Sequence, residues 1–190
     1  MSITRNTSAA SIVHATPVAD DVLVEQVRRG LPDALGALYE RYAGRLFPVA
    51  YRLTASTPDA EDVLHDLFLG LPELLRKYDH QGQLFDWLRS VTIRLALIGM
   101  RKERRRDRFS GTQLEGALVA GPAADPWHAI DLANAVAGLP ASLRAVFVLR
   151  QIEGYSHDET AALLGLTSGA SRVRFLRALR HLRKVLEPAK

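Results

Sequence analysis

The chain contains no cysteine among its 190 residues. This absence excludes disulfide-stapled folds, thiolate metal sites and cysteine nucleophiles. Long apolar runs are missing too, since the longest candidate, Leu95–Met100, is far shorter than the roughly 20 residues of a membrane span. Residues 1–19 are polar, rich in Ser, Thr and Ala, and lack the apolar core of a signal peptide. We therefore expect a disordered leader and a cytoplasmic protein without membrane insertion.

Patterns that indicate catalysis are also lacking. The six histidines are scattered, and none forms a His-x-x-x-His pair. The sequence has no glycine-rich phosphate loop and no nucleophile elbow. The carboxylates between Asp59 and Asp66 resemble a solvated or partner-binding face more than a metal site. We predict that the protein is not an enzyme and has no cofactor and no metal.

Charge is distributed unevenly along the chain, although the net charge is only +4. Asp59–Asp79 holds six acids against two bases, whereas Arg89–Arg108 holds eight bases against two acids. Gly165–Lys184 holds six bases and no acid. Because most of these bases are arginines, which suit phosphates and base edges, the pattern favours two nucleic-acid contacts and a separate acidic face.

Helical periodicity dominates the sequence, and no alternating strand pattern of useful length occurs. Residues 109–127 interrupt this periodicity, because they are rich in Gly, Ala and Pro, and the stretch 109–125 contains no basic residue. We therefore predict an all-α fold, with two small helical domains at 20–108 and 128–190 joined by a flexible linker at 109–127.

A helix-turn-helix pattern lies in the second predicted domain. Ser156 and Glu159 fit a capping box, and the helix that they begin ends at Gly165. Thr167 or Ser168 then begins a helix that carries Arg172, Arg174 and Arg177. A short helix, a glycine turn and an arginine-bearing helix form the arrangement that reads the DNA major groove.

Aromatic and basic residues combine in the first predicted domain. Tyr78, Phe85 and Trp87 lie near the start of a long helix that continues through Arg89 and Arg94. Aromatic rings beside cations can stack on unpaired bases, but the same spacing also suits a helix core.

As a set, these residues resemble the extracytoplasmic-function group of sigma factors, in the sigma-70 family. Asp59-Ala60-Glu61-Asp62, Asp66-Leu67-Phe68-Leu69, Trp87-Leu88 and the basic run from Arg101 resemble region two of that family. Glu153-Gly154-Tyr155-Ser156, Glu159-Thr160-Ala161 and Leu163-Leu164-Gly165-Leu166 resemble region four. Arg94, Ile98 and Ser171 depart from the residues usual at their positions, so the base preference is expected to differ.

The resemblance implies a transcription-initiation factor that binds core RNA polymerase and recognises promoter DNA. The implied polymerase contacts, on the β′ clamp helices, are Asp59, Glu61, Asp62, Asp66 and Phe68. The implied contacts to the minus-ten element are Tyr78, Trp87, Arg89, Arg94, Arg101 and Arg105. The implied contacts to the minus-thirty-five element are Ser168, Ser171, Arg172, Arg174 and Arg177. The β flap and an anti-sigma factor are further expected partners.

Two other interpretations remain open. A sigma-mimicking adaptor would bind an anti-sigma factor without touching DNA, but it would need no basic recognition helix. A stand-alone helix-turn-helix regulator would bind duplex DNA without polymerase, but this leaves the acidic helix unexplained.

Overall fold

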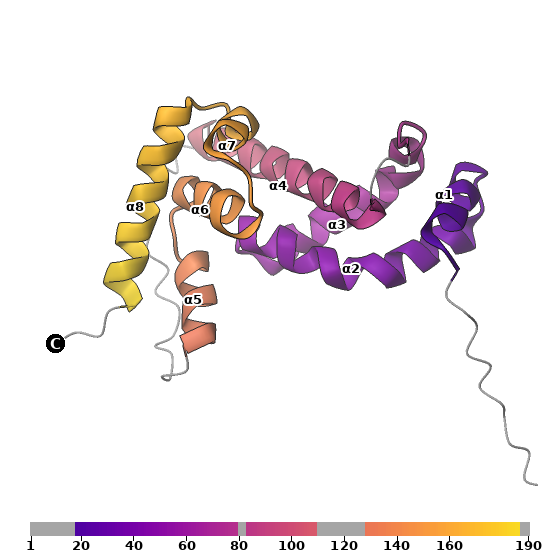
Figure 1. The fold of residues 1–190 in the computed structure, drawn as a ribbon, viewed down its shortest axis with the longest axis horizontal. Helices are drawn as coiled ribbons and strands as arrows, with labels where there is room; N and C mark the ends of the chain where they lie inside the picture. Colours follow the sequence, from indigo (N-terminus) through magenta and orange to yellow (C-terminus); the bar gives the residue numbers. More distant parts are fainter. Residues whose placement is uncertain (1–17, 80–82, 110–127, 187–190) are drawn as a thin grey trace, which may run out of the picture.

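The computed structural model describes residues 18–79, 83–109 and 128–186, and all regular structure within these ranges is helical (Figure 1). The all-α prediction is confirmed. Apart from Phe109, which ends the fourth helix, the predicted linker lies outside the described residues, as does the leader apart from its last two residues. Among the described helices, none is long and apolar enough to cross a membrane.

The first lobe is built from four helices, namely α1 (Asp20–Arg28), α2 (Pro32–Thr54), α3 (Thr57–Leu75) and α4 (Leu84–Phe109). Pro32 begins α2, where its missing N–H costs nothing. Ala55, with a φ of 55°, ends α2 in the left-handed conformation, and the Ser56 hydroxyl then accepts a hydrogen bond from the Asp59 N–H at 3.4 Å to cap α3. This tight turn sets α2 and α3 against one another.

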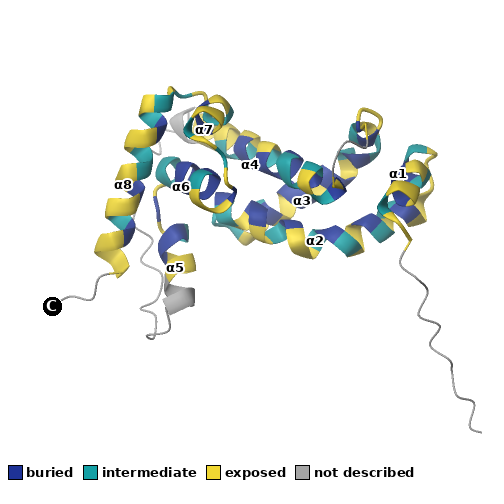
Figure 2. Ribbon diagram, viewed as in Figure 1, coloured by how far each residue is buried: buried dark blue, intermediate teal, exposed yellow. Residues whose placement is uncertain are grey.

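One apolar core lies wholly within the first lobe. Its fully buried members include Leu38 and Leu46 of α2, Leu67 and Leu71 of α3 and Leu88 of α4. They repeat at helical spacing and so face inward from three helices, as the sequence periodicity predicts. Figure 2 shows this buried face along the helices, with exposed residues outside it.

The second lobe contains α5 (His128–Ala137), α6 (Ala141–Phe147), α7 (His157–Leu164) and α8 (Ser168–Leu186). A π-helical segment, η1 (Val148–Ile152), continues α6. The sequence pattern predicts one uninterrupted helix over Ala141–Gln151. In the structure, the second half of this segment is instead a π-helix, whose hydrogen bonds span five residues rather than four. Such segments are often found at functional positions.

A second apolar core joins the two lobes. It combines Val49 and Leu53 of α2 and Ile93 of α4 with Val148 and Leu149 of η1, all 3% exposed or less. The sequence predicts two separate lobes and gives no indication that they share a core. In Figure 1, α6 accordingly lies directly against α2.

Arg144 of α6 provides a polar connection across the same boundary. Its guanidinium donates to the Leu53 and Thr54 carbonyls at 3.0 and 2.8 Å, and to the Ala137 and Leu139 carbonyls at 3.0 Å each. The first two carbonyls end α2, where a cation also complements the helix dipole. Burial, followed by the positive charge of Arg104, lowers the pKa of Arg144. Arg144 therefore holds α2 and the α5–α6 turn together.

Candidate nucleic-acid interface

Helices α7 and α8 form the predicted helix-turn-helix. The Ser156 hydroxyl accepts from the Glu159 N–H at 3.1 Å, while the Glu159 carboxylate accepts from the Ser156 N–H at 2.7 Å. The hydrogen bonds with Ser156 lower the pKa of Glu159. Gly165, with a φ of +65°, ends α7 in a conformation that few other residues adopt. The predicted capping box and glycine turn are both present.

The turn leads into α8 through Thr167. Its hydroxyl accepts from the Ala170 N–H at 3.1 Å, so Thr167, rather than Ser168, caps this helix. The Ser168 hydroxyl is instead buried without a protein partner.

Three arginines of α8 differ in their exposure. Arg172 and Arg177 are exposed, whereas Arg174 is half-buried and faces the first lobe. Residues two apart on a helix diverge by about 200°, which is why Arg172 and Arg174 point differently.

Ser171 does not lie on this exposed surface. Its side chain is fully buried, with the hydroxyl 3.0 Å from Nδ1 of His157 on α7. The His157 ring also meets the edge of Phe175, with 5.7 Å between ring centroids. Burial, and then the positive charges of Arg150 and Arg172, lower the pKa of His157. Ser171 was predicted as a DNA contact, but here it joins the two helices of the motif, which corrects that expectation.

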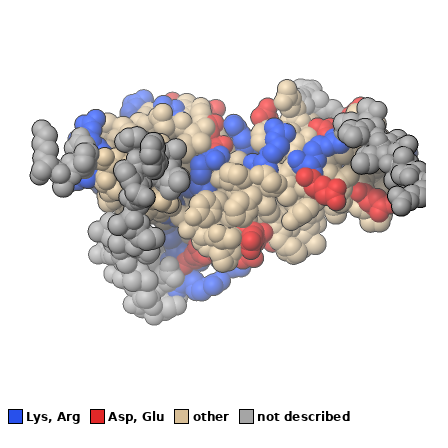
Figure 3. All heavy atoms as spheres, turned by 90° about the horizontal axis from the view of Figure 1, so that it is seen from below, with Lys and Arg blue, Asp and Glu red and all other residues tan. Residues whose placement is uncertain are grey.

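Helix α4 presents a basic stripe to solvent. Arg94, Arg101 and Arg105 are exposed at spacings of seven and four residues, with exposed Ile98 between them. The Arg101 guanidinium also donates to the Leu163 carbonyl at the end of α7. Seen from below, Lys and Arg side chains occur on both halves of the molecule, with acidic side chains scattered among them (Figure 3).

Arg89 lies on a different side of α4 from this stripe. Its guanidinium contacts Glu153 of the second lobe, with Nη2 donating to the Glu153 carbonyl at 3.3 Å. The structure therefore separates Arg89 from the other predicted minus-ten arginines.

Tyr78 and Trp87 meet at the start of α4. Their ring centroids are 4.9 Å apart, with Tyr78 buried and Trp87 half-buried. Arg28 of α1 supports this corner by donating to the carbonyls of Leu75, at 3.0 Å, and Tyr78. Burial, followed by the negative charges of Asp20 and Asp79, raises the pKa of Tyr78.

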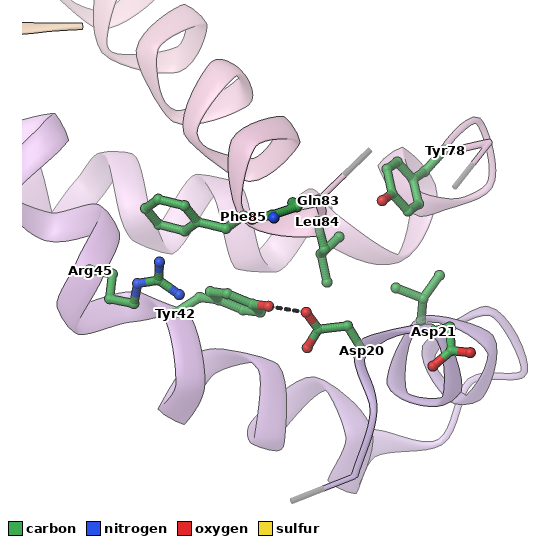
Figure 4. A pocket seen from close by; sticks show the side chains of 9 residues that line it. Asp20, Asp21, Tyr42, Arg45, Tyr78, Gln83, Leu84 and Phe85 are labelled. Carbon is green, nitrogen blue, oxygen red and sulfur yellow. Dashed lines mark hydrogen bonds between the residues drawn. The ribbon is translucent and has the colours of Figure 1, made fainter. Parts of the chain in front are cut away.

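A pocket of about 360 Å³ opens beside this aromatic pair. Figure 4 shows the Tyr42 hydroxyl donating to the Asp20 carboxylate on one side and Arg45 reaching toward Phe85. The Arg45 guanidinium carbon lies 3.8 Å from the Phe85 ring centroid, a cation–π contact. Burial, together with the Asp20 hydrogen bond, raises the pKa of Tyr42 to about 12. No sequence pattern indicates a functional role for Asp20, Tyr42 or Arg45.

Helix α3 carries the acidic surface. Glu61, Asp62 and Asp66 are exposed, and Leu69, 71% exposed, lies beside them. Asp59 is half-buried in the first turn. Phe68 is only 6% exposed, because Tyr39 of α2 covers it with 4.9 Å between ring centroids. The carboxylates are therefore accessible to a partner, while Phe68 supports the surface from beneath.

The two basic sets approach each other across the lobe boundary. Arg101 and Arg104 of α4 and Arg174 of α8 line one small cavity of about 50 Å³, together with Ser142 of α6. Side chains that the sequence assigns to separate DNA contacts thus share one cleft.

Comparison with known proteins identifies both lobes. The model of Sigma-70 region 2 matches residues 38–106, and that of Sigma-70, region 4 matches residues 129–182. The sigma factor CarQ of Myxococcus xanthus is 29% identical over 165 residues, which cover 86% of this chain and 95% of CarQ. The ECF sigma factor SigE of Mycolicibacterium smegmatis is 34% identical over 158 residues, which cover 78% of this chain and 60% of SigE.

A solved structure shows the same fold. The sigma factor RpoE of Bartonella quintana, crystallised with the anti-sigma factor NepR, superimposes with a TM-score of 0.53 at 23% identity. The superposition covers 77% of this chain and 92% of RpoE. With an acidic helix and a basic helix in the first lobe and a basic helix-turn-helix in the second, the chain belongs to the extracytoplasmic-function group of the sigma-70 family.

Proposed function

We propose that this chain is an alternative sigma factor that binds core RNA polymerase through α3 and promoter DNA through α4 and α8. The observation that carries the proposal is the division of charge, with exposed carboxylates on one helix and exposed arginines on two others. Such a protein is an initiation factor rather than an enzyme, and it acts in the cytoplasm.

Polymerase binding is assigned to Glu61, Asp62 and Asp66, with Asp59 at the helix start and Phe68 beneath. Their exposure leaves them free to meet the basic surface of a partner, which we take to be the β′ clamp helices. The β flap is the proposed partner of the second lobe, and an anti-sigma factor is the proposed inhibitor.

Minus-ten recognition is assigned to the corner of Tyr78 and Trp87 and to the stripe of Arg94, Arg101 and Arg105. The pocket beside Tyr78 has space for a base taken out of the stack, and the Tyr42, Phe85 and Arg45 side chains offer flat surfaces to it. Arg89 is a weaker candidate, because it faces the second lobe.

Minus-thirty-five recognition is assigned to Arg172, Arg174 and Arg177, near the start of α8. An arginine-bearing second helix of a helix-turn-helix suits the major groove. Ser168 and Ser171 are buried at their hydroxyls, so their role is to position the helix.

In vitro transcription with core polymerase on a library of promoters tests the proposal. We expect transcripts from a subset of promoters that share two upstream elements. Binding to an anti-sigma factor without transcription from any promoter would indicate the adaptor, and binding to duplex DNA without polymerase would indicate the stand-alone regulator. A variant with Asp62→Lys and Asp66→Lys serves as the control, because it should lose transcription while keeping its helical content.

A further inference from the structure

Glu153 of the second lobe inserts its carboxylate between two arginines of the first lobe. Oε1 lies 3.1 Å from Nη2 of Arg52 on α2, and Oε2 lies 3.6 Å from Nε of Arg89 on α4. The Glu153 side chain is only 2% exposed, while the two arginine side chains are about a third exposed. A carboxylate with so little access to water must rely on these two cations for its stabilisation.

The π-helical segment places Glu153 at this position. The Glu153 N–H donates to the Val148 carbonyl at 2.9 Å, five residues back, and so closes the wide turn of η1. Gly154 follows with a φ of +79°, which directs the chain away toward α7. The carboxylate is therefore held against the first lobe by the backbone, not by a flexible loop.

The cluster leaves some polar groups unsatisfied. The Nε atoms of Arg52 and Arg89 are both buried without a hydrogen-bond acceptor in the protein. Each guanidinium has five N–H donors. The carboxylate and the carbonyl of Glu153 do not provide enough acceptors for the donors of two guanidiniums. When the lobes separate, water can reach all of these groups, so the electrostatic gain on closing is partly offset. Such a contact is suited to opening.

The closed arrangement conflicts with simultaneous recognition of two promoter elements. Arg101 is bonded to the Leu163 carbonyl, and Arg174 faces Arg101 and Arg104 across a single cleft. Elements centred at minus ten and minus thirty-five lie about 25 base pairs apart, which at about 3.4 Å per base pair is about 85 Å. The two lobes cannot reach both elements while their arginines line one small cavity.

We propose that Glu153, Arg52 and Arg89 form a latch that holds the free factor closed, and that polymerase binding requires the latch to open. The consequence for polymerase rests on the function proposed above, whereas closure itself does not. Arg52 belongs to neither the proposed polymerase-binding residues nor the proposed DNA-binding residues, so the latch is its one proposed role.

Fluorescence energy transfer in the free chain tests the closure. Because the chain has no cysteine, Lys77→Cys and Lys184→Cys introduce two unique, exposed labelling positions, one on each lobe. Glu153→Gln and Arg52→Gln, which alter the latch from opposite lobes, should each lower the transfer efficiency. Glu73→Gln is the matched control, because it removes a carboxylate from an exposed pair with Arg76, at 2.9 Å, and should leave the efficiency unchanged.

Affinity for core polymerase provides the second measurement. If only the open form binds, the apparent affinity of the factor for polymerase is proportional to the fraction of molecules that are open. Glu153→Gln and Arg52→Gln should therefore bind polymerase about threefold tighter or more. Unchanged energy transfer in both variants, with native circular dichroism, would overturn the latch. Lower transfer without tighter binding would overturn its inhibitory role. Failure of every form, wild type included, to bind polymerase would instead contradict the proposed function and leave the energy-transfer result valid.

Discussion

Nδ1 of His157 lies 3.0 Å from the Ser171 hydroxyl and so connects the first turn of α7 to the buried side of α8. A neutral imidazole can accept a hydrogen bond at one ring nitrogen and donate at the other, whereas an imidazolium can only donate. Because the Ser171 hydroxyl can either donate or accept, the protonation state of His157 determines which of the two groups donates in this contact.

A pH dependence of stability follows from this contact. Burial and the nearby Arg150 and Arg172 lower the pKa of His157 below its ordinary value of 6.5. The unfolded chain then takes up the proton first as the pH falls, so the free energy of unfolding decreases below about pH 6.5 and is unaffected well above it. Urea unfolding at pH 7.5, 6.5 and 5.5 should show this decrease in the wild type and a smaller one in His157→Gln. His65→Gln, at an exposed position of α3, should behave like the wild type; an equal slope in all three proteins would refute the prediction.

Replacement of Arg144 should strongly destabilise the protein. Arg144→Met leaves four carbonyls without their donor, and we expect a loss of about 3 kcal/mol in the free energy of unfolding. The stability of Arg144→Lys should fall between that of the wild type and that of Arg144→Met, because an ammonium has three donors and lacks the planar geometry of a guanidinium. Chemical denaturation followed by circular dichroism measures both, and a loss below about 0.5 kcal/mol in Arg144→Met would contradict the assignment.

Charge reversal at Asp62 should weaken holoenzyme assembly without unfolding the protein. The side chain is exposed on α3, so Asp62→Lys changes the surface and not the core. We expect about tenfold weaker binding to core polymerase, the effect of losing roughly 1.4 kcal/mol. Glu73→Lys, near the end of the same helix, is the control. Equal binding by Asp62→Lys and the wild type would remove Asp62 from the interface.

The arginines of α8 should give two different phenotypes in promoter binding. Loss of a base contact costs about 1–3 kcal/mol and relaxes specificity at that base. Loss of a phosphate contact instead lowers the slope of log affinity against log salt concentration by about one. Because Arg172 and Arg174 point to different sides, Arg172→Ala and Arg174→Ala should separate into these two classes, with Arg177→Ala following Arg174→Ala. Holoenzyme binding to upstream-element variants over a salt series measures this. If all three variants kept wild-type selectivity and salt dependence, α8 would have no role in recognition.

Much of the local structure could be predicted from sequence. Ser156, Glu159 and Gly165 each act through neighbours within a few residues, so the capping box and the end of α7 are readable from local chemistry. The burial of Ser171 also had a signal, because Ala178 and Leu182 lie seven and eleven residues further on and are buried on the same side of α8.

The contacts between the lobes could not be predicted in this way. Arg52 and Glu153 are 101 residues apart, and neither belongs to a pattern that indicates a partner. The π-helical turn that orients Glu153 has the same apolar spacing as an ordinary helix. The pocket formed by Asp20, Tyr42 and Phe85 likewise depends on how α1, α2 and α4 pack, which periodicity alone does not determine.

The core shared by the lobes gives their association a temperature dependence. Val49 and Leu53 pack with Val148 and Leu149, so separation of the lobes exposes apolar surface to water. The free energy gained by burying such surface becomes smaller on cooling. Cooling therefore weakens the association of the lobes, and if the closed form excludes polymerase as proposed above, a larger fraction of the factor is accessible to polymerase in the cold.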